Sequence, residues 1–364
     1  MRVLLVTVHL RCGGAERVMS WLAARLDALG HEVTLATWFL PIDDFYALPP
    51  GVARVGVRDD TRQARFQFHV DRVRFIRRIR QLAKDADVVL AFLPDANVAT
   101  LLATIGLGVP VVVSERNHPV WSGARRRSGR LGGWLVRWRA AAFVVQSADI
   151  AEAFRLRWGI TGAVVIPNAP AIAIAAATHR GPVVLSVGRL VEAKDHATLI
   201  RAWARVASTY PQWTLRIIGE GPLKQALGTM VQQLGLEHRV EIIEPRVDIG
   251  TEFQAASIFV LPSVTEGFPN ALLEAAASGC ACIATDCPGA SADIVDHGSA
   301  GLLVPVGDHV ALAAALESLV GDAGQRDELG EAARVSAGRF DADTVVGQWV
   351  QVLSHARRAG VLRT

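Results

Sequence analysis

Two glutamates eight positions apart stand out in this chain of 364 residues. Glu266 and Glu274 begin and end the string Glu-Gly-Phe-Pro-Asn-Ala-Leu-Leu-Glu, which follows the apolar run 257–261. We predict a strand over 257–261 and a helix over 270–278, with one carboxylate on the connecting loop and the other about one turn into the helix. At such a strand end, free helix N–H groups bind an anion and carboxylates accept hydrogen bonds from sugar or ribose hydroxyls. The string therefore predicts a nucleotide-sugar site.

Two cations are expected at the same sheet edge. Arg189 and Lys194 follow the apolar run 183–187 on one loop, where Gly188 allows a tight turn, and a helix begins at about Asp195. Arginine offers a fork of donors and lysine a point charge, so a diphosphate is the ligand that suits them. The alternative is a pair of solvated loop cations. The glutamate string at the matching strand end favours the diphosphate.

Short apolar runs alternate with longer segments of helical period along the chain. Continuous apolar runs in this alternation are typical of parallel sheets covered by helices on both faces. We predict strands over 2–8, 32–37, 87–91, 109–113 and 142–145, and then over 183–187, 214–218, 240–243, 257–261, 281–284 and 301–304. The expected architecture is α/β, with two Rossmann-like domains facing each other across a cleft. We place them at 1–168 and 182–340, with a Pro- and Gly-marked linker at 169–181 and a helix at 341–364 that packs back on the first domain.

Charge is unevenly divided between the two halves. Residues 1–180 carry 24 Lys and Arg against 14 Asp and Glu, whereas residues 181–364 carry 14 against 21. The basic half predicts an acidic partner for that half alone. Hydrophobic residues make up 51% of the chain, yet no run approaches the roughly 18 apolar residues of a membrane span. The apolar start of the chain, up to residue 10, is too short and wrongly flanked for a signal peptide.

Metal and disulfide chemistry are not expected. The four cysteines, Cys12, Cys280, Cys282 and Cys287, have no repeated paired spacing, which favours reduced, structural thiols in a cytosolic protein. Two Asp-x-Asp strings, 85–87 and 341–343, lie at the start of a predicted strand and at the head of the last helix. The first string lies at the strand end away from the predicted ligand edge, and the second suits a helix cap, so we predict a site that works without a metal ion.

Four strings together resemble retaining glycosyltransferases of family 4, which have the GT-B fold. They are Ser186-Val-Gly-Arg189 with Lys194, the segment Glu266 to Glu274, Gly13-Gly-Ala-Glu-Arg17, and Ser114-Glu-Arg-Asn-His-Pro119. The resemblance covers nearly the whole chain. More narrowly, the chain is similar to members that extend polyprenyl-diphosphate-linked glycans with N-acetylhexosamines, often N-acetylgalactosamine.

The resemblance implies a role for each donor-site residue. Arg189 and Lys194 would hold the diphosphate and neutralise it as it leaves, Glu274 would accept from both ribose hydroxyls, and Glu266 would lie against the transferred sugar. The acceptor would attack from the face that the diphosphate leaves, with no carboxylate clearly placed as a covalent nucleophile. The remaining donor-binding candidates are Gly13, Gly14, Gly188, Arg246, Gly267, Phe268, Asn270 and Ala271. Arg246 follows a strand end that could flank the base, but it does not distinguish UDP from GDP. The segment Pro288 to Asp293 departs from the family's Gly-Pro and Glu, so its part in phosphate binding stays open.

Two further groups are candidates for the acceptor side. Arg116 and His118 follow the predicted strand 109–113; either contacts the acceptor or the donor sugar, or holds the loop. His118 is counted with the catalytic candidates, though not as a general base.

The helical segment 65–84 has an apolar face of Phe68, Phe75, Ile79 and Leu82 opposite Arg74, Arg77 and Arg78. Further arginines, Arg125, Arg126, Arg127, Arg130, Arg137 and Arg139, are interleaved with Trp121, Trp134 and Trp138. These features fit an anionic membrane surface, a grip on the lipid-linked diphosphate, or a solvated face. No nucleic-acid recognition motif is present.

The predicted function is metal-independent, retaining transfer of a sugar from a UDP-sugar to a polyprenyl-diphosphate-linked glycan. The protein would be cytoplasmic and peripheral on the cytoplasmic face of the inner membrane. Two alternatives remain: the same fold acting on a soluble sugar or phosphosugar, and a catalytically silent sugar-nucleotide-binding scaffold. The sugar, linkage and oligomeric state are not predicted.

Overall fold

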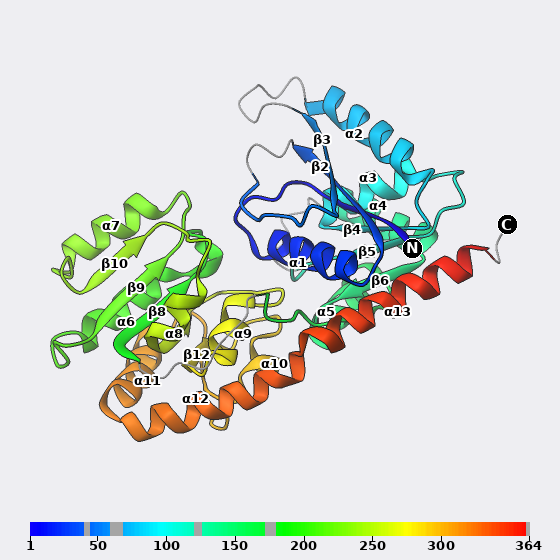
Figure 1. The fold of residues 1–364 in the computed structure, drawn as a ribbon. Coiled ribbons are helices and arrows are strands. Elements are labelled where there is room, and N and C mark those ends of the chain that lie inside the picture. The colour runs from blue at the N-terminus through cyan, green and yellow to red at the C-terminus, as the bar shows by residue number, and fades with distance from the viewer. Residues whose placement is uncertain (40–43, 59–67, 120–125, 172–179, 362–364) are drawn as a thin grey trace. The chain divides into compact units, whose positions relative to one another are not determined.

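The chain folds into two compact units, each built on one parallel sheet (Figure 1). The computed structural model describes residues 1–39, 44–58, 68–119, 126–171 and 180–361. The first unit holds Met1–Asn168 and Ala342–Thr364, and the second holds Ala169–Asp341. The predicted α/β class with two parallel-sheet domains is confirmed. Most of the predicted linker, residues 172–179, lies outside the described residues, and its last residue, Gly181, opens a strand of the second sheet.

The first sheet has seven strands in the order β3-β2-β1-β4-β5-β6-β7. Its central strands are buried, as their continuous apolar runs predict. The strands are β1 Arg2–Thr7, β2 Glu32–Phe39, β3 Ala53–Arg58, β4 Val88–Phe92, β5 Val111–Ser114, β6 Ala142–Val145 and β7 Val164–Val165. The edge strands β3 and β7 were not predicted.

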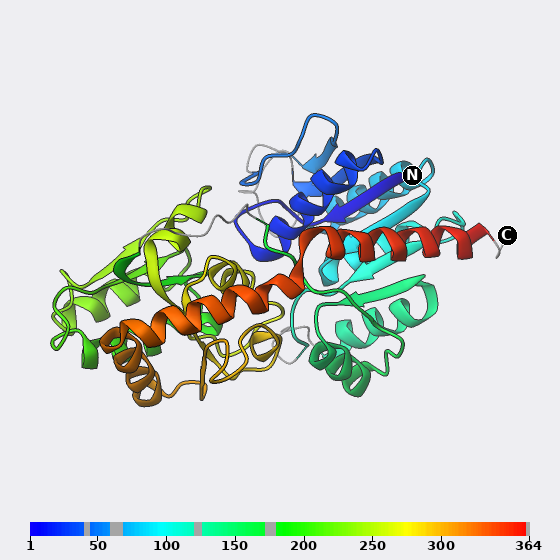
Figure 2. The same cartoon turned by 60° about the horizontal axis from the view of Figure 1, so that its bottom comes forward.

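Helices cover both faces of this sheet. One face carries α1 (Gly14–Ala28) and the terminal helix α13 (Ala342–Val361), which contact each other. The other face carries α2 (Phe68–Ala83), α3 (Pro94–Ala103), α4 (Arg126–Arg139) and α5 (Ala148–Trp158), as right-handed crossovers require. Figure 2 shows α13 running along the first unit, where it packs on β4 and β5.

The terminal helix belongs to the first unit through apolar and ionic contacts. Trp349 and Leu353 are fully buried, and the Trp349 ring lies 5.6 Å from that of Phe92 on β4. The Arg25 guanidinium of α1 pairs with Asp343 in the first turn. This aspartate of the second Asp-x-Asp string therefore has an arginine partner.

The second sheet has six strands in the order β10-β9-β8-β11-β12-β13. They are β8 Gly181–Val187, β9 Thr214–Ile218, β10 Val240–Ile243, β11 Ala256–Leu261, β12 Ala281–Thr285 and β13 Leu302–Val304. The helices are η2 Glu192–Lys194, α6 His196–Val206, α7 Lys224–Gln233, α8 Gly250–Ala255, α9 Asn270–Ala277, α10 Ser291–Ile294, α11 His309–Gly321, α12 Ala323–Ala337 and η3 Gly338–Phe340. The chain leaves β8 towards β9 and returns to β11 on its other side. A topological switch point therefore lies between β8 and β11, where ligands bind in open parallel sheets.

Three further features concern the described residues only. Among them, no helix is both long and apolar enough to cross a membrane. Within the same residues, no group of three or more His, Cys, Asp and Glu side chains is arranged to hold a metal ion. Cys12, Cys280, Cys282 and Cys287 form no disulfide with one another.

Candidate active site

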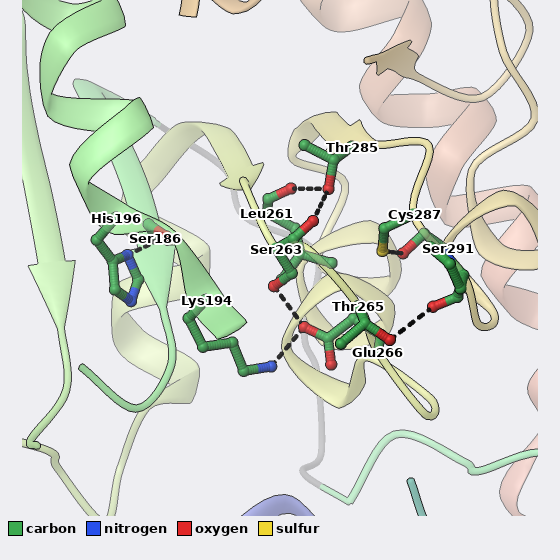
Figure 3. A network of polar contacts seen from close by, with 11 residues as sticks. Ser186, Lys194, His196, Leu261, Ser263, Thr265, Glu266, Thr285, Cys287 and Ser291 are labelled. Carbon is green, nitrogen blue, oxygen red and sulfur yellow. Dashed lines mark hydrogen bonds and ion pairs between the residues drawn. The ribbon is translucent and has the colours of Figure 1, made fainter. Parts of the chain in front are cut away.

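The switch point of the second sheet brings Lys194 and Glu266 together. Lys194 ends η2, which follows β8, and Glu266 lies on the loop after β11. The Lys194 ammonium donates to Oε1 of Glu266 (Figure 3). Lys194 is partly buried, and the Glu266 side chain is only 8% exposed. Residues 72 positions apart thus form a charge pair at the predicted ligand edge.

Ser263 holds the same carboxylate oxygen from the other side. Its hydroxyl donates to Glu266 Oε1 over 2.6 Å, and its own carbonyl accepts from the Thr285 hydroxyl at the end of β12. Both hydroxyl-bearing residues are fully buried. Among the described residues, Oε2 of Glu266 has no hydrogen-bond partner. One oxygen is therefore anchored, and the other is available to a ligand.

The loop after β8 is shaped by two glycines of the loop after β9. A Cβ on Gly219 would lie 1.9 Å from the Gly188 carbonyl oxygen, and one on Gly221 would lie 2.5 Å from that of Leu190. Leu190 is fixed further, because its N–H donates to the backbone carbonyl of Glu220 over 2.7 Å. Arg189 between them is exposed, and its guanidinium makes no ion pair with the other described residues.

Asp195 turns the chain from η2 into α6. Its φ of +42° lies in the left-handed region, which aspartate tolerates better than most residues. Its carboxylate caps α6 by accepting from the Thr198 N–H over 3.2 Å. The Val264 N–H also donates to the Ala193 carbonyl over 2.9 Å. The lysine loop and the glutamate loop are therefore joined through backbone as well as side chains.

His196, which the sequence reasoning did not single out, lies beneath the lysine loop. Its ring is buried, Nδ1 is 3.5 Å from the Ser186 hydroxyl, and a Cβ on Gly188 would lie 3.7 Å from Nε2. Burial, with a smaller contribution from Lys194, lowers the pKa of His196 to about 4. The imidazole is therefore neutral near pH 7 and supports the loop without adding charge.

The segment after β12 braces the glutamate loop. The Glu266 N–H donates to the Pro288 carbonyl over 3.0 Å, and the Ala290 N–H donates to that of Gly267 over 3.2 Å. Gly289 has a φ of +126°, and a Cβ there would lie 2.2 Å from the Glu266 carbonyl oxygen. This segment therefore fixes the backbone of Glu266 in place.

The remaining donor-site candidates surround this network. Glu274 is buried on α9 one turn after Asn270, and Gly267 and Phe268 are buried on the loop before it. The N-cap of α9 is Pro269, whose side chain caps no backbone N–H of the first turn, which includes Ala271. Arg246 differs from the rest, because its guanidinium pairs with Glu252 of α8 over 2.8 Å.

In the first unit, Gly13 and Gly14 follow β1 at its own switch point. Gly13 is the N-cap of α1, and a Cβ on it would lie 2.2 Å from Oε2 of the buried Glu16. The absence of a side chain at Gly13 therefore makes room for a glutamate within the first turn.

The string after β5 forms a buried polar cluster. The Asn97 amide donates to Glu115 Oε1 over 2.8 Å, and burial raises the pKa of Glu115 to about 8. The Arg116 guanidinium donates to Asn168 and lies 4.5 Å from the ring centroid of Phe92, and burial lowers its pKa to about 9. Glu115 was not predicted as a site residue.

His118 and the helix arginines lie in different surroundings. His118 is buried with Nε2 3.5 Å from Asp149 of α5; burial lowers its pKa and Asp149 opposes the shift. Arg74, Arg77 and Arg78 are exposed on α2, opposite the buried Phe75 and Ile79. Trp121 and Arg125 lie outside the described residues, as do the side chains of Phe68, Arg126, Arg127 and Arg130.

Two family descriptions match consecutive parts of the chain. Residues 12–170 match the family described as Glycosyltransferase Family 4, and residues 171–336 match that described as Glycosyl transferases group 1. The two matched segments together span residues 12–336, and both descriptions are of glycosyltransferases.

Among curated relatives, a Campylobacter jejuni α-1,4-N-acetyl-D-galactosaminyltransferase that acts on an undecaprenol-linked glycan is 24% identical. That match covers 99% of this chain and 100% of the relative. An exopolysaccharide phosphotransferase of Streptomyces coelicolor is 40% identical, but over 48% of this chain and 19% of its own length. An uncharacterized glycosyltransferase of Haemophilus influenzae is matched over 48% of its length. The chain thus spans less than half of these last two relatives.

Solved structures share the fold over nearly the full chain. Sucrose-phosphate synthase from Thermosynechococcus elongatus has a TM-score of 0.85 at 20% identity, covering 98% of this chain and 99% of its own. Anabaena HepE in complex with UDP-glucose has a TM-score of 0.80 at 21% identity, covering 97% and 99%. The predicted GT-B fold is confirmed.

Proposed function

We propose that this glycosyltransferase moves a sugar from a UDP-sugar to a polyprenyl-diphosphate-linked glycan, with retention of anomeric configuration. The observation that carries the proposal is the Lys194–Glu266–Ser263 network at the switch point of the second sheet. It combines a cation for a diphosphate with a carboxylate whose second oxygen can accept from sugar hydroxyls. UDP is the proposed nucleotide because HepE, whose structure holds UDP-glucose, has the same fold.

Donor binding would redistribute the contacts of Lys194. A diphosphate beside Arg189 competes for the lysine ammonium, while Ser263 keeps its hydrogen bond to Glu266. The cations then neutralise the charge that develops on the leaving nucleoside diphosphate. Glu266 presents Oε2 to the sugar, and Glu274 on α9 accepts from the ribose. These cations supply the charge that a divalent ion supplies elsewhere, so we propose metal-independent transfer.

The acceptor proposal has separate support. The Campylobacter relative that matches the whole chain acts on a diphospho-undecaprenol-linked glycan, and N-acetylgalactosamine is its transferred sugar. Exposed arginines on α2, namely Arg74, Arg77 and Arg78, offer donors for such a diphosphate. We place the protein on the cytoplasmic face of the inner membrane, held peripherally, with Arg116 and His118 near the acceptor.

Calorimetric titration with UDP, GDP and ADP tests the donor proposal. We expect UDP to bind tightest, EDTA to leave its affinity unchanged, and Glu274→Gln to weaken it by about tenfold or more. Glu317→Gln, at an exposed position of α11, is the matched control. Failure of all three nucleotides to bind would contradict the transferase proposal.

Product analysis tests the proposed retention of configuration and the proposed lipid-linked acceptor. With a UDP-sugar and a lipid-linked glycan, we expect the α-configured donor to give an α-linked product by NMR. Transfer to soluble sugars or sugar phosphates alone would overturn the lipid-linked acceptor and leave the donor proposal intact.

A further inference from the structure

The outer face of the first unit exposes apolar side chains at the ends of two neighbouring helices. α3 packs between α2 and α4. Trp134 and Trp138 of α4 are 54% and 58% exposed, and Leu102 and Ile105 at the end of α3 are 38% and 41% exposed. With Arg137, which is also exposed, these residues form what we call the tryptophan surface. None of them lies at the carboxyl edge of the sheet, where the site candidates of this unit follow β1 and β5.

The two tryptophans point outwards because the opposite side of α4 packs through glycines. A Cβ on Gly133 would lie 3.1 Å from Cβ of Trp158 on α5, and one on Gly132 would lie 3.5 Å from a methyl group of Val98 on α3. Trp134 and Trp138 are one helical turn apart, and their rings stack with centroids 5.3 Å apart. They form one preformed aromatic plate that the core does not use.

Arginines from both neighbouring helices anchor the end of α3. Arg80 of α2 donates to the carbonyls of Ala103 and Ile105 over 2.9 and 2.7 Å. Arg139 of α4 donates to the Thr104 carbonyl over 3.0 Å. These bonds satisfy carbonyls that a helix end leaves open. The exposed Leu102 and Ile105 are therefore held in place beside α4.

The charged residues of these three helices are mainly basic. In sequence, α2, α3 and α4 contain ten arginines and two aspartates. A partner must therefore be anionic, and a second copy of the same face would bring arginine against arginine. Nucleic acid would match the charge, yet it offers nothing to the exposed leucine and isoleucine. An anionic bilayer matches both, because its surface attracts arginines and its interface accepts tryptophan and aliphatic side chains.

We propose that the tryptophan surface is the membrane contact of this protein, with Trp134 and Trp138 inserted at the interface of an anionic bilayer. This inference adds a specific contact surface to the proposed peripheral attachment. It rests on the proposed function in one respect, because the lipid-linked acceptor is the reason for the protein to bind a membrane. The flanking arginines direct the face to acidic headgroups, and the aromatic plate retains it there.

Vesicle flotation of the full chain without nucleotide tests the proposal. We expect binding to vesicles of equal parts phosphatidylglycerol and phosphatidylcholine, and at least about tenfold weaker binding to phosphatidylcholine alone. The double variant Trp134→Ala/Trp138→Ala should lose about tenfold or more of the binding to anionic vesicles. The double variant Leu234→Ala/Val335→Ala removes exposed apolar side chains from the second unit and should bind as wild type.

Titration of UDP separates this inference from the proposed function. The tryptophan variant should bind UDP as wild type does when no vesicles are present, and its circular dichroism should be unchanged. Equal vesicle binding by wild type and the tryptophan variant would overturn the assignment. The assignment would also be overturned if the wild type failed to bind anionic vesicles. Binding of RNA in place of anionic vesicles, or self-association through this face shown by light scattering, would overturn it as well.

Discussion

At the scale of single residues, Lys194 is the group on which the two loops of the site depend. It neutralises a carboxylate that is only 8% exposed, and it is a partly buried cation at the proposed diphosphate position. Lys194→Ala removes both interactions, so we expect kcat to fall by about 100-fold or more. The measurement is steady-state sugar transfer at saturating donor. Lys224→Ala, which breaks an exposed pair with Glu244, is the control. A Lys194 variant within a few-fold of wild type would remove this residue from the mechanism.

Ser263 acts through Glu266, as a positioning residue. Its hydroxyl fixes Oε1, so Ser263→Ala frees the carboxylate to rotate while leaving the charge in place. A hydrogen bond to a charged group contributes about 1.5–3 kcal/mol, so kcat should fall by about ten- to hundredfold with KM for the donor little changed. Thr285→Val should show a smaller loss of the same kind, and Thr285→Ser should restore it, since serine keeps the hydroxyl that donates to Ser263. If Ser263→Ala instead raised KM for the donor by a similar factor and left kcat unchanged, Ser263 would contribute to donor binding and not to positioning Glu266.

Glu115 should make stability depend on pH. Its pKa rises from 4.5 to about 8 on folding, so between these values the unfolded chain releases a proton that the native protein keeps. This group therefore lowers the free energy of unfolding as pH rises through that window, by about 1.4 kcal/mol per pH unit. Glu115→Gln stays neutral and can still accept from Asn97, so its stability gain should grow from pH 5 to pH 8. Urea unfolding at several pH values measures this, with Glu317→Gln as control; parallel pH curves for Glu115→Gln and wild type would refute it.

At the scale of elements, a glycine after β12 sets the position of the glutamate loop. Gly289→Ala places a methyl group 2.2 Å from the Glu266 carbonyl oxygen at a φ that alanine disfavours. We expect a loss of about 1–3 kcal/mol in stability and a drop in kcat, because the loop must shift. Thermal unfolding and transfer kinetics report both. Gly228→Ala, in the open interior of α7, should instead stabilise by about 0.5–1 kcal/mol with kcat unchanged.

The elements and site residues that the sequence predicted are those whose character depends on local pattern alone. Buried strands such as β11 and β12 were predicted because every residue of them is apolar or nearly so. The edge strand β3 was missed because arginines and a glycine interrupt its pattern, and β7 because it has two residues. Lys194 and Glu266 were predicted from strand-end positions. Ser263, Thr285 and Gly289 were not, because their roles arise from contacts between separate loops. Glu115 was missed because its environment is made by Asn97, 18 positions earlier.

At the scale of the whole molecule, the chain leaves the first unit after Asn168 and rejoins it at Ala342. The first unit is therefore complete only when α13 is present. Trp349 links this helix to the site of that unit, since its ring packs against Phe92 and the Arg116 guanidinium also lies over the Phe92 ring.

Trp349→Ala removes a side chain that is 1% exposed, so we expect the free energy of unfolding of the first unit to fall by about 3–5 kcal/mol. Because Trp349 belongs to the first unit alone, calorimetric unfolding should show a transition that moves to lower temperature and another that stays. UDP binding should persist below the shifted transition, since most of its proposed partners lie in the second unit. Trp134→Ala, at a 54% exposed position of the same unit, should change stability by less than about 0.5 kcal/mol. A single transition that shifts as a whole would instead show that the two units unfold together.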